Sequence, residues 1–407
     1  MNLTSLEVSI AGAGIGGLSL ATLLARQGAA VTIYDQMAAP QPVGSGFVIQ
    51  PTGAAVLSHM ELLDQVLARG SRIRRMHGRL SSNGRTVLDV SYAKGGHGIA
   101  IQRVALFDLL LDAAVRAGVG FETSSRVTAV EDGSRPRVVL DGRNGSPADL
   151  VVDAMGASSP LDRKSATELS YGALWATVPW PKGGPFAEDE LQQRYHRASQ
   201  MAGVLPVGTA HDGAAPMATF FWSIRNADVA AWRNAGRAAW INEVGAFWPD
   251  VVDLAEIAEP VHARYRHHTR QPLAGRNVIR IGDAWHATSP QLGQGANMAL
   301  LDAASLCSAL ASQPTIADGL TQHLHQRQMH IRFYQLLSSI LTPFYQSDSR
   351  ILHFSRDLLI GPVTKFPLLR GLITTLVTGE LLSPVARIAF DRIALDSGEQ
   401  DALGQPA

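Results

Sequence analysis

The sequence of 407 residues contains a single cysteine, Cys307, so it can form neither an internal disulfide nor a cysteine-based zinc site. It also has no excess of either charge, because 35 Lys and Arg residues balance 35 Asp and Glu residues. This balance argues against a nucleic-acid partner. The N-terminus has no basic region followed by a long apolar region, so a secretory signal is not predicted. We expect a cytoplasmic protein.

Long apolar runs are also missing, since no stretch reaches the roughly eighteen consecutive apolar residues of a membrane-spanning helix. The nearest candidate, residues 358–382, is interrupted by prolines and charged residues. We interpret it as a pair of short core helices joined by a loop. The alternative is a segment that docks on a membrane surface through Lys365 and Arg370.

Glycine is concentrated at one point near the N-terminus, in the stretch AGAGIGG (11–17). An apolar, β-branched run precedes it and predicts a strand over 6–11. Apolar residues at helical spacing follow it and predict a helix over 15–28. The glycines therefore lie at a strand-to-helix turn in the pattern G-x-G-x-x-G. This pattern indicates that the turn requires residues without side chains.

The three spaced glycines suit a dinucleotide phosphate. Gly12 permits the tight turn, Gly14 lets the backbone approach a pyrophosphate, and Gly17 lets the helix pack against the strand. A second predicted strand ends on Asp35, whose carboxylate can accept hydrogen bonds from a ribose. No arginine follows Asp35 to receive a 2′-phosphate, so the site favours FAD or NAD over NADP.

A second glycine-rich stretch, GDAWHATSPQLGQGAN (282–297), follows a predicted strand and precedes a helix that runs to about residue 310. Asp283 can hydrogen-bond a ribityl hydroxyl. Gly293 and Gly295 expose backbone amides that can stabilise negative charge on a reduced isoalloxazine ring. Because NAD has no ribityl chain, the two stretches together indicate FAD.

These two stretches, with IQRVALFDLLLDAA (101–114) between them, resemble the single-component FAD-dependent monooxygenases of the aromatic hydroxylase type, the para-hydroxybenzoate hydroxylase-like superfamily. The resemblance covers residues 5 to about 340. It implies an α/β fold with a Rossmann-like FAD-binding domain, an inserted antiparallel-sheet substrate domain and C-terminal helices. The expected parts are an FAD-binding domain (1–166 and 276–310), a substrate-binding domain (167–275), a helical region (311–395) and a tail (396–407).

The resemblance also implies an FAD site. Arg103 would reach the phosphates or the ribitol, and Val127 would contact the adenine through its backbone. Pro290 and residues 293–297 would lie beside the flavin ring where oxygen reacts. The complete set is Gly12, Gly14, Ile15, Gly16, Gly17, Asp35, Arg103, Val127, Asp283, Pro290, Gly293, Gly295, Ala296 and Asn297.

One stretch departs from the family pattern of a D-G pair followed by Ser and Arg. In DLVVDAMGASSPLDR (149–163), Gly156 and Ser159 fit, but Met155 stands where the acid is expected. Asp153 lies two positions early and Arg163 one position late. Since this stretch helps control nicotinamide access in the family, the departure bears on reduction by NAD(P)H more than on FAD binding.

The middle of the chain, residues 167–275, alternates apolar and polar runs and predicts antiparallel strands with one helix over 228–249. A substrate cavity on this sheet would use residues such as Trp175, Tyr195, Met201, Phe221 and Trp222, but an aromatic residue on a strand is more often sheet core than a ligand contact, so we assign none of them to the site. The 13 histidines suggest a metal, and the densest group is HARYRHH (262–268). Without an H-E-x-x-H pattern or acids at ligand spacing, we predict no metal site. A long amphipathic helix is predicted over 319–345.

The chain has one complete G-x-G-x-x-G unit, which FAD would occupy, so NAD(P)H is expected as a transient co-substrate. The resemblance implies that NAD(P)H reduces FAD, that O2 forms a flavin C4a-hydroperoxide, and that a small aromatic or phenolic substrate is hydroxylated. The catalytic base is not identified; His286, His196 and Tyr195 are candidates. The alternatives are an epoxidase or quinone-type hydroxylase of a lipidic substrate, and an FAD-binding reductase or sensor without oxygenation. We expect a monomer or a homodimer.

Overall fold

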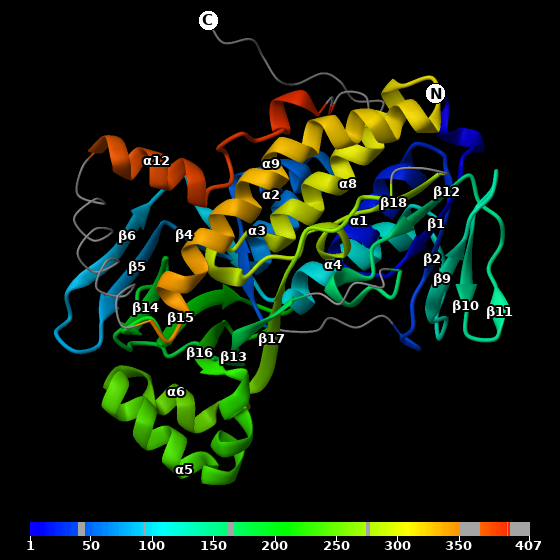
Figure 1. The fold of residues 1–407 in the computed structure, drawn as a ribbon. Coiled ribbons are helices and arrows are strands. Elements are labelled where there is room, and N and C mark those ends of the chain that lie inside the picture. The colour runs from blue at the N-terminus through cyan, green and yellow to red at the C-terminus, as the bar shows by residue number, and fades with distance from the viewer. Residues whose placement is uncertain are drawn as a thin grey trace, which may run out of the picture.

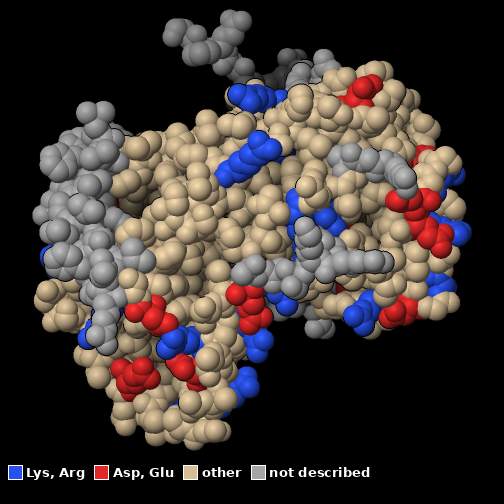
Figure 2. All heavy atoms as spheres, viewed as in Figure 1, with Lys and Arg blue, Asp and Glu red and all other residues tan. Residues whose placement is uncertain are grey.

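The computed structural model describes residues 1–39, 45–92, 95–161, 167–273, 277–349, 367–388 and 390. In the view of Figure 1, one large sheet lies on the right and the other on the left and lower centre, with the long helices α8 (Gly295–Ser312) and α9 (Ile316–Tyr345) across the top. The expected α/β architecture, with parallel and antiparallel sheets and C-terminal helices, is confirmed. In the face shown in Figure 2, acidic and basic side chains are intermingled rather than separated by sign.

The first large sheet is five-stranded and parallel. Its strand order is β18 (Val278–Arg280), β12 (Leu150–Asp153), β1 (Glu7–Ala11), β2 (Ala30–Tyr34) and β8 (Gly120–Glu122). Both faces are covered, which explains why its central strands are apolar along their whole length. Helices lie on one face, and a three-stranded antiparallel sheet of β9 (Val127–Glu131), β10 (Arg137–Leu140) and β11 (Arg143–Asn144) packs on the other.

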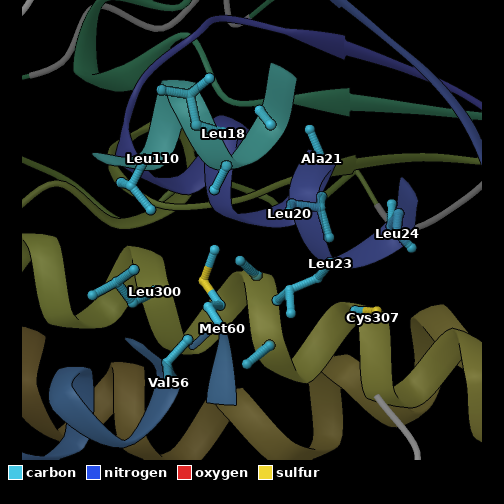
Figure 3. Close-up of a cluster of buried hydrophobic side chains, with 14 of the residues drawn as sticks. Leu18, Leu20, Ala21, Leu23, Leu24, Val56, Met60, Leu110, Leu300 and Cys307 are labelled. Carbon is cyan, nitrogen blue, oxygen red and sulfur yellow. The ribbon is translucent and has the colours of Figure 1, made fainter. Parts of the chain in front are cut away.

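The largest hydrophobic core lies on the helical face of this sheet. Helix α1 (Ile15–Arg26) packs there between α4 (Arg103–Arg116) and α8 (Gly295–Ser312) (Figure 3). Leu18, Leu20 and Leu24 of α1 are fully buried, and Cys307 is buried in the same core. Next to α8 lie α2 (Pro51–His59), α3 (Leu63–Arg69) and a small sheet of β3 (Phe47–Ile49), β7 (Gly98–Ile101) and β4 (Ser71–Ile73).

The second large sheet has seven strands. Their order is β17 (Val261–His267), β13 (Thr167–Pro179), β16 (Met217–Arg225), β15 (Gln200–Gly208), β14 (Glu190–His196), β5 (Arg75–Leu80) and β6 (Thr86–Ser91). All neighbouring pairs are antiparallel except β14 and β5. Strands β5 and β6 come from the segment expected in the FAD-binding domain. We therefore propose that residues 75–91 belong with the 167–275 unit.

The two faces of this sheet differ in what covers them. On the outer face, α5 (Val229–Phe247) and α6 (Val252–Ile257) cover Trp222, whose ring lies 5.0 Å from that of Phe247. The expectation that Trp222 faces a substrate cavity is therefore wrong. The other cavity candidates share the inner face in one cluster, namely Trp175, Tyr195, Met201 and Phe221. Helix α5 is also kinked at Gly236, where φ is 81°.

The C-terminal part contains α9 (Ile316–Tyr345) and α12 (Pro367–Val377). Helix α9 begins three residues before the predicted 319, because Thr315 caps its first turn by accepting from Asp318 N. Of the two short helices predicted over 358–382, only the second falls within the described residues, as α12. In the described part of the chain, no helix is long and apolar enough to cross a membrane.

A buried ionic cluster joins α7 (Asp283–His286), α8 and α9. The carboxylate of Asp302 in α8 accepts from Arg327 Nε at 2.6 Å and contacts His286 Nε2 at 2.7 Å. It also accepts from the amide of Gly282 at 2.8 Å. Burial alone would raise the pKa of Asp302, but His286 and Arg327 hold it well below its usual range. The cluster therefore carries a stable carboxylate that fixes the turn at Gly282.

Two buried histidines of α9, His323 and His330, lie in the same region. Burial lowers the pKa of His323 to about 4 and that of His330 to about 3. His323 Nδ1 pairs with Ser305 Oγ at 3.0 Å, while its Nε2 has no partner among the described residues. Both rings are therefore neutral in the folded protein at neutral pH.

These depressed pKa values predict a loss of stability in mild acid. The unfolded chain binds a proton at His323 below about pH 6.5, whereas the folded chain does not until about pH 4. As the pH decreases through this window, the free energy of unfolding should fall by about 1.4 kcal/mol per pH unit for each such histidine. Urea unfolding of the wild type and of His323→Asn at pH 7, 6 and 5 measures how steeply the free energy of unfolding changes with pH. The substitution should make this dependence less steep. The exposed His325 on the same helix supplies the matched control, and a slope that His325→Asn reduces equally would refute this account.

Candidate functional site

A cavity of about 760 Å³ opens at the carboxyl ends of the parallel strands, where ligands bind in open α/β sheets. The residues directly after β1, β2, β12 and β18 all line it, because parallel strands end at one edge. The described cavity wall includes Gly12, Gly14, Ile15, Gly16, Asp35, Met37, Phe47, Arg103, Ser125, Arg126, Val127, Met155, Gly156, Tyr265, Asp283, Thr288, Pro290, Gly293, Gly295 and Ala296.

The three spaced glycines of the first turn differ in what surrounds them. Gly12 has φ of 106°, and a Cβ there would stand 2.6 Å from Ala154 O. A Cβ on Gly17 would stand 2.1 Å from Gly12 O, so the helix could not approach the strand. A Cβ on Gly14 would meet nothing within 4 Å. Its space is open cavity, at the N-cap of a helix whose first amides have no side-chain cap.

Asp35 and Val127 form one end of the cavity. Asp35 Oδ2 accepts from Ala13 N at 2.9 Å, and Oδ1 accepts from Met37 N at 2.9 Å. These bonds fix the carboxylate and leave each oxygen a lone pair for a further donor. Val127 begins β9 at the same end, close to Ser125, whose amide donates to Asp35 O at 2.8 Å. The sequence-distant residues predicted for the ribose and the adenine therefore lie together.

The Gly-Asp turn after β18 forms the middle of the cavity. Gly282 has φ of 57°, and this turn directs the Asp283 side chain outward into the cavity. A Cβ built on Gly295 would stand 3.8 Å from Asp283 Oδ1, so the acid lies at the start of α8. Burial raises the pKa of Asp283, and the nearby His286 and Arg103 act against this rise. The start of α8 again has no side-chain cap.

Arg103, the first residue of α4, brings a positive charge to this wall. Its guanidinium carbon lies 5.0 Å from the centre of the Phe47 ring. Its Nε is buried and has no hydrogen-bond partner among the described residues. Burial lowers the pKa of Arg103, and Asp283 opposes this change. A half-buried guanidinium with an unpaired Nε, in the same cavity as the uncapped start of α1, fits an anionic pyrophosphate.

Two of the predicted FAD-binding residues lie away from the cavity wall. Gly17 faces Gly12 beneath the turn, as described above. Asn297 accepts from Gln50 N at 2.8 Å and donates to Gly293 O at 3.1 Å, so it connects the start of α8 to α2. All the other predicted residues line one cavity. Their role as FAD ligands stays a prediction, which this shared location supports.

The three candidate bases do not reach the cavity. His286 is buried against Asp302, and Tyr195 is buried with its hydroxyl donating to Gln193 Oε1 at 2.8 Å. His196 is exposed on β14. No observation supports any of them as the base.

The stretch that departs from the family pattern also borders the cavity. Met155 and Gly156 line it, whereas Asp153 is fully buried and pairs with Arg280 Nε at 3.3 Å. Ser159 donates to Asp153 Oδ2 at 2.6 Å. Asp153 therefore ties β12 to β18 and does not replace the missing acid. Arg163 lies outside the described residues.

Residues 262–268 do not form a metal site, and no group of three potential ligands occurs in the described parts of the chain. His262 Nε2 contacts Asn226 Oδ1 at 2.9 Å, and Arg264 pairs with Glu168. Two residues of this strand, Arg264 and Tyr265, line the cavity. The signal for Tyr265 in the sequence is that it is the one Phe, Trp or Tyr among the histidines and arginines of residues 262–268.

Comparison with known proteins gives a consistent result. The family model described as "FAD binding domain" matches residues 5–319. The FAD-dependent monooxygenase pynG of Aspergillus niger is 29% identical over 80% of this chain and 84% of its own length. The 6-hydroxynicotinate 3-monooxygenase of Bordetella bronchiseptica is 26% identical over 74% of this chain and 81% of its own. The structure of Klebsiella pneumoniae HpxO complexed with FAD and uric acid has the same fold, with a TM-score of 0.78, 22% identity, and coverage of 94% of this chain and 100% of that one.

The chain belongs to the FAD binding domain family. The expectation of an FAD-dependent monooxygenase of the aromatic hydroxylase type, an oxidoreductase with FAD as cofactor and NAD(P)H as co-substrate, is confirmed.

Two glycine substitutions separate folding from cofactor binding. Gly14→Ala should leave the thermal unfolding temperature of the apoprotein unchanged, because its Cβ has free space. It should weaken FAD binding at least roughly tenfold, because the methyl group occupies the phosphate space. Gly17→Ala should instead destabilise the apoprotein by roughly 1–3 kcal/mol, because its Cβ overlaps Gly12 O. Apoprotein unfolding and FAD fluorescence titration measure both effects. If Gly14→Ala binds FAD as tightly as the wild type, Gly14 does not belong to the FAD site.

Proposed function

We propose that this protein inserts one oxygen atom of O2 into a small heteroaromatic ring that already carries a hydroxyl or oxo group. The observation that carries this proposal is the single cavity that joins the two glycine turns, Asp35, Arg103 and Asp283. The substrate class is supported by two similar proteins, since one is named for 6-hydroxynicotinate and the other is complexed with uric acid. Both are nitrogen heterocycles that carry oxygen substituents on the ring.

The balanced reaction is R–H + NAD(P)H + H⁺ + O2 → R–OH + NAD(P)⁺ + H2O. Bound FAD supplies the redox chemistry, since it accepts hydride and activates oxygen. The protein residues bind and orient the cofactor. Asp35 and Val127 would hold its adenosine end, and the start of α1 would hold its pyrophosphate together with Arg103. Asp283 would hold its ribitol, and the start of α8 would lie beside its flavin ring. The walls at Pro290 and Gly293 would exclude water from the reacting ring.

A reductase or sensor without oxygenation is the second candidate function. The observation that favours it is Met155, because the cavity has no acid at the position where the family carries one. Nicotinamide access is the step that this substitution would affect. A cytoplasmic location and a monomeric or homodimeric state stay predictions.

Oxygen labelling distinguishes the two functions. The FAD-loaded protein is incubated with NADH or NADPH, ¹⁸O2, and either urate or 6-hydroxynicotinate. We expect that at least one compound increases NAD(P)H consumption and gives a product containing one ¹⁸O atom, detected by mass spectrometry.

Free FAD with NAD(P)H is the background control, because NAD(P)H can reduce free flavin and the reduced flavin then converts oxygen to hydrogen peroxide. NAD(P)H consumption that yields hydrogen peroxide alone with every compound would contradict hydroxylation. Absence of any NAD(P)H consumption would favour the sensor.

A further inference from the structure

Tyr265 of β17 lines the same cavity as Asp35 and Val127, together with Thr288 and Pro290. The chain just after β17 is hydrogen-bonded to this loop, since His268 N donates to Ala287 O at 3.0 Å. Tyr265 therefore lies beside the segment that leads into α8. This is the part of the cavity where the flavin ring and the substrate are expected to meet.

The Tyr265 hydroxyl group has one partner, and that partner determines where its proton points. Trp175 Nε1 in the neighbouring strand β13 donates to the hydroxyl oxygen at 2.7 Å. An indole N–H can only donate, so the oxygen is the acceptor and its own proton must point elsewhere. In the described part of the chain, nothing accepts that proton. The unused donor therefore belongs to a group on the cavity wall.

The surrounding contacts keep this donor protonated and fixed. Burial raises the pKa of Tyr265 above its usual value, although the Trp175 hydrogen bond opposes the rise. The phenol is therefore neutral at physiological pH. Trp175 is itself packed against Phe221, with 4.9 Å between the ring centres. A donor held by a packed neighbour can select a ligand by the position of one acceptor atom.

We propose that Tyr265, held by Trp175, orients the substrate by donating a hydrogen bond to an oxygen on its ring. This rests on the proposed function and adds a specificity-determining residue to it. Tyr265 transfers no proton in this role. A ring with an oxygen at the correct position binds with that oxygen against Tyr265, which fixes the carbon presented to the flavin.

A pair of ligands that differ by one oxygen tests this role without turnover. 6-Hydroxynicotinate and nicotinate are titrated separately into the FAD-loaded protein, without NAD(P)H, and binding is followed by the change in flavin absorbance. The wild type should bind 6-hydroxynicotinate roughly ten- to a hundredfold more tightly. Tyr265→Phe should weaken the binding of 6-hydroxynicotinate by that factor and leave the affinity for nicotinate unchanged.

Tyr171→Phe is the matched control on strand β13. Its hydroxyl donates to Asp348 Oδ1 at 2.6 Å, away from the cavity, so the preference for 6-hydroxynicotinate should persist. Trp175→Phe keeps an aromatic ring but removes the indole donor. It should reduce the preference by less than Tyr265→Phe does. FAD content and thermal unfolding establish whether each variant is folded. If Tyr265→Phe does not fold, Trp175→Phe still tests the role of the hydroxyl group.

Three results would overturn the inference. In the first, the wild type shows no preference for 6-hydroxynicotinate or binds neither compound. In the second, Tyr265→Phe retains the preference. In the third, Tyr265→Phe weakens the binding of both compounds equally and shifts the flavin spectrum. This would mean that the hydroxyl group donates its hydrogen bond to the flavin. Because the readout is binding alone, a protein that shows the predicted preference but hydroxylates nothing contradicts the proposed function and not the role of Tyr265.

Discussion

The close approach of α1 to β1 is the constraint on which the rest of the site depends. It requires a carbonyl oxygen of Gly12 to lie where a side chain on Gly17 would be, and it requires a positive φ at Gly12. Once these two positions are glycine, the free amides of α1 open directly onto the edge where the parallel strands end. The neighbouring strand then places Asp35 beside the same turn. A dinucleotide site thus follows from one packing contact and the parallel order of the strands.

The other half of the cavity depends on a buried charge. Asp302 binds the Gly282 amide, His286 and Arg327, so α7, α8 and α9 are held around one carboxylate. A buried carboxylate is costly without several partners, and here the partners come from two segments, α7 with its N-cap Gly282 and helix α9. The result is a fixed Gly282 turn that keeps Asp283 in the cavity next to Gly295. The sequence motif around Gly282 therefore has two roles: Asp283 faces the cavity, and Gly282 and His286 hold the turn in place through Asp302.

The local elements around both glycine turns were predictable because they depend on short-range spacing. The strand, turn and helix from residue 6 to 28 and the helix from Gly295 need no distant information. The pairing of His286 with Asp302, and of Asp302 with Arg327, was not predictable, since Asp302 and Arg327 lie on later helices. Trp222 was assigned to the wrong face because strand alternation alone does not tell which face α5 covers. Tyr265 was missed because its role depends on Trp175, ninety residues away along the chain.

The central claim is that one continuous cavity holds both halves of FAD, with the adenosine end at Asp35 and Val127 and the ribitol at Asp283. Titration of the apoprotein with FAD and, separately, with FMN, followed by flavin fluorescence, tests this claim most directly. FMN carries the ring, the ribitol and one phosphate, so it fills only the half near Asp283. The account predicts that FAD binds at least roughly a hundredfold more tightly than FMN, because the adenosine end adds its own contacts. Equal affinity for FAD and FMN would contradict it.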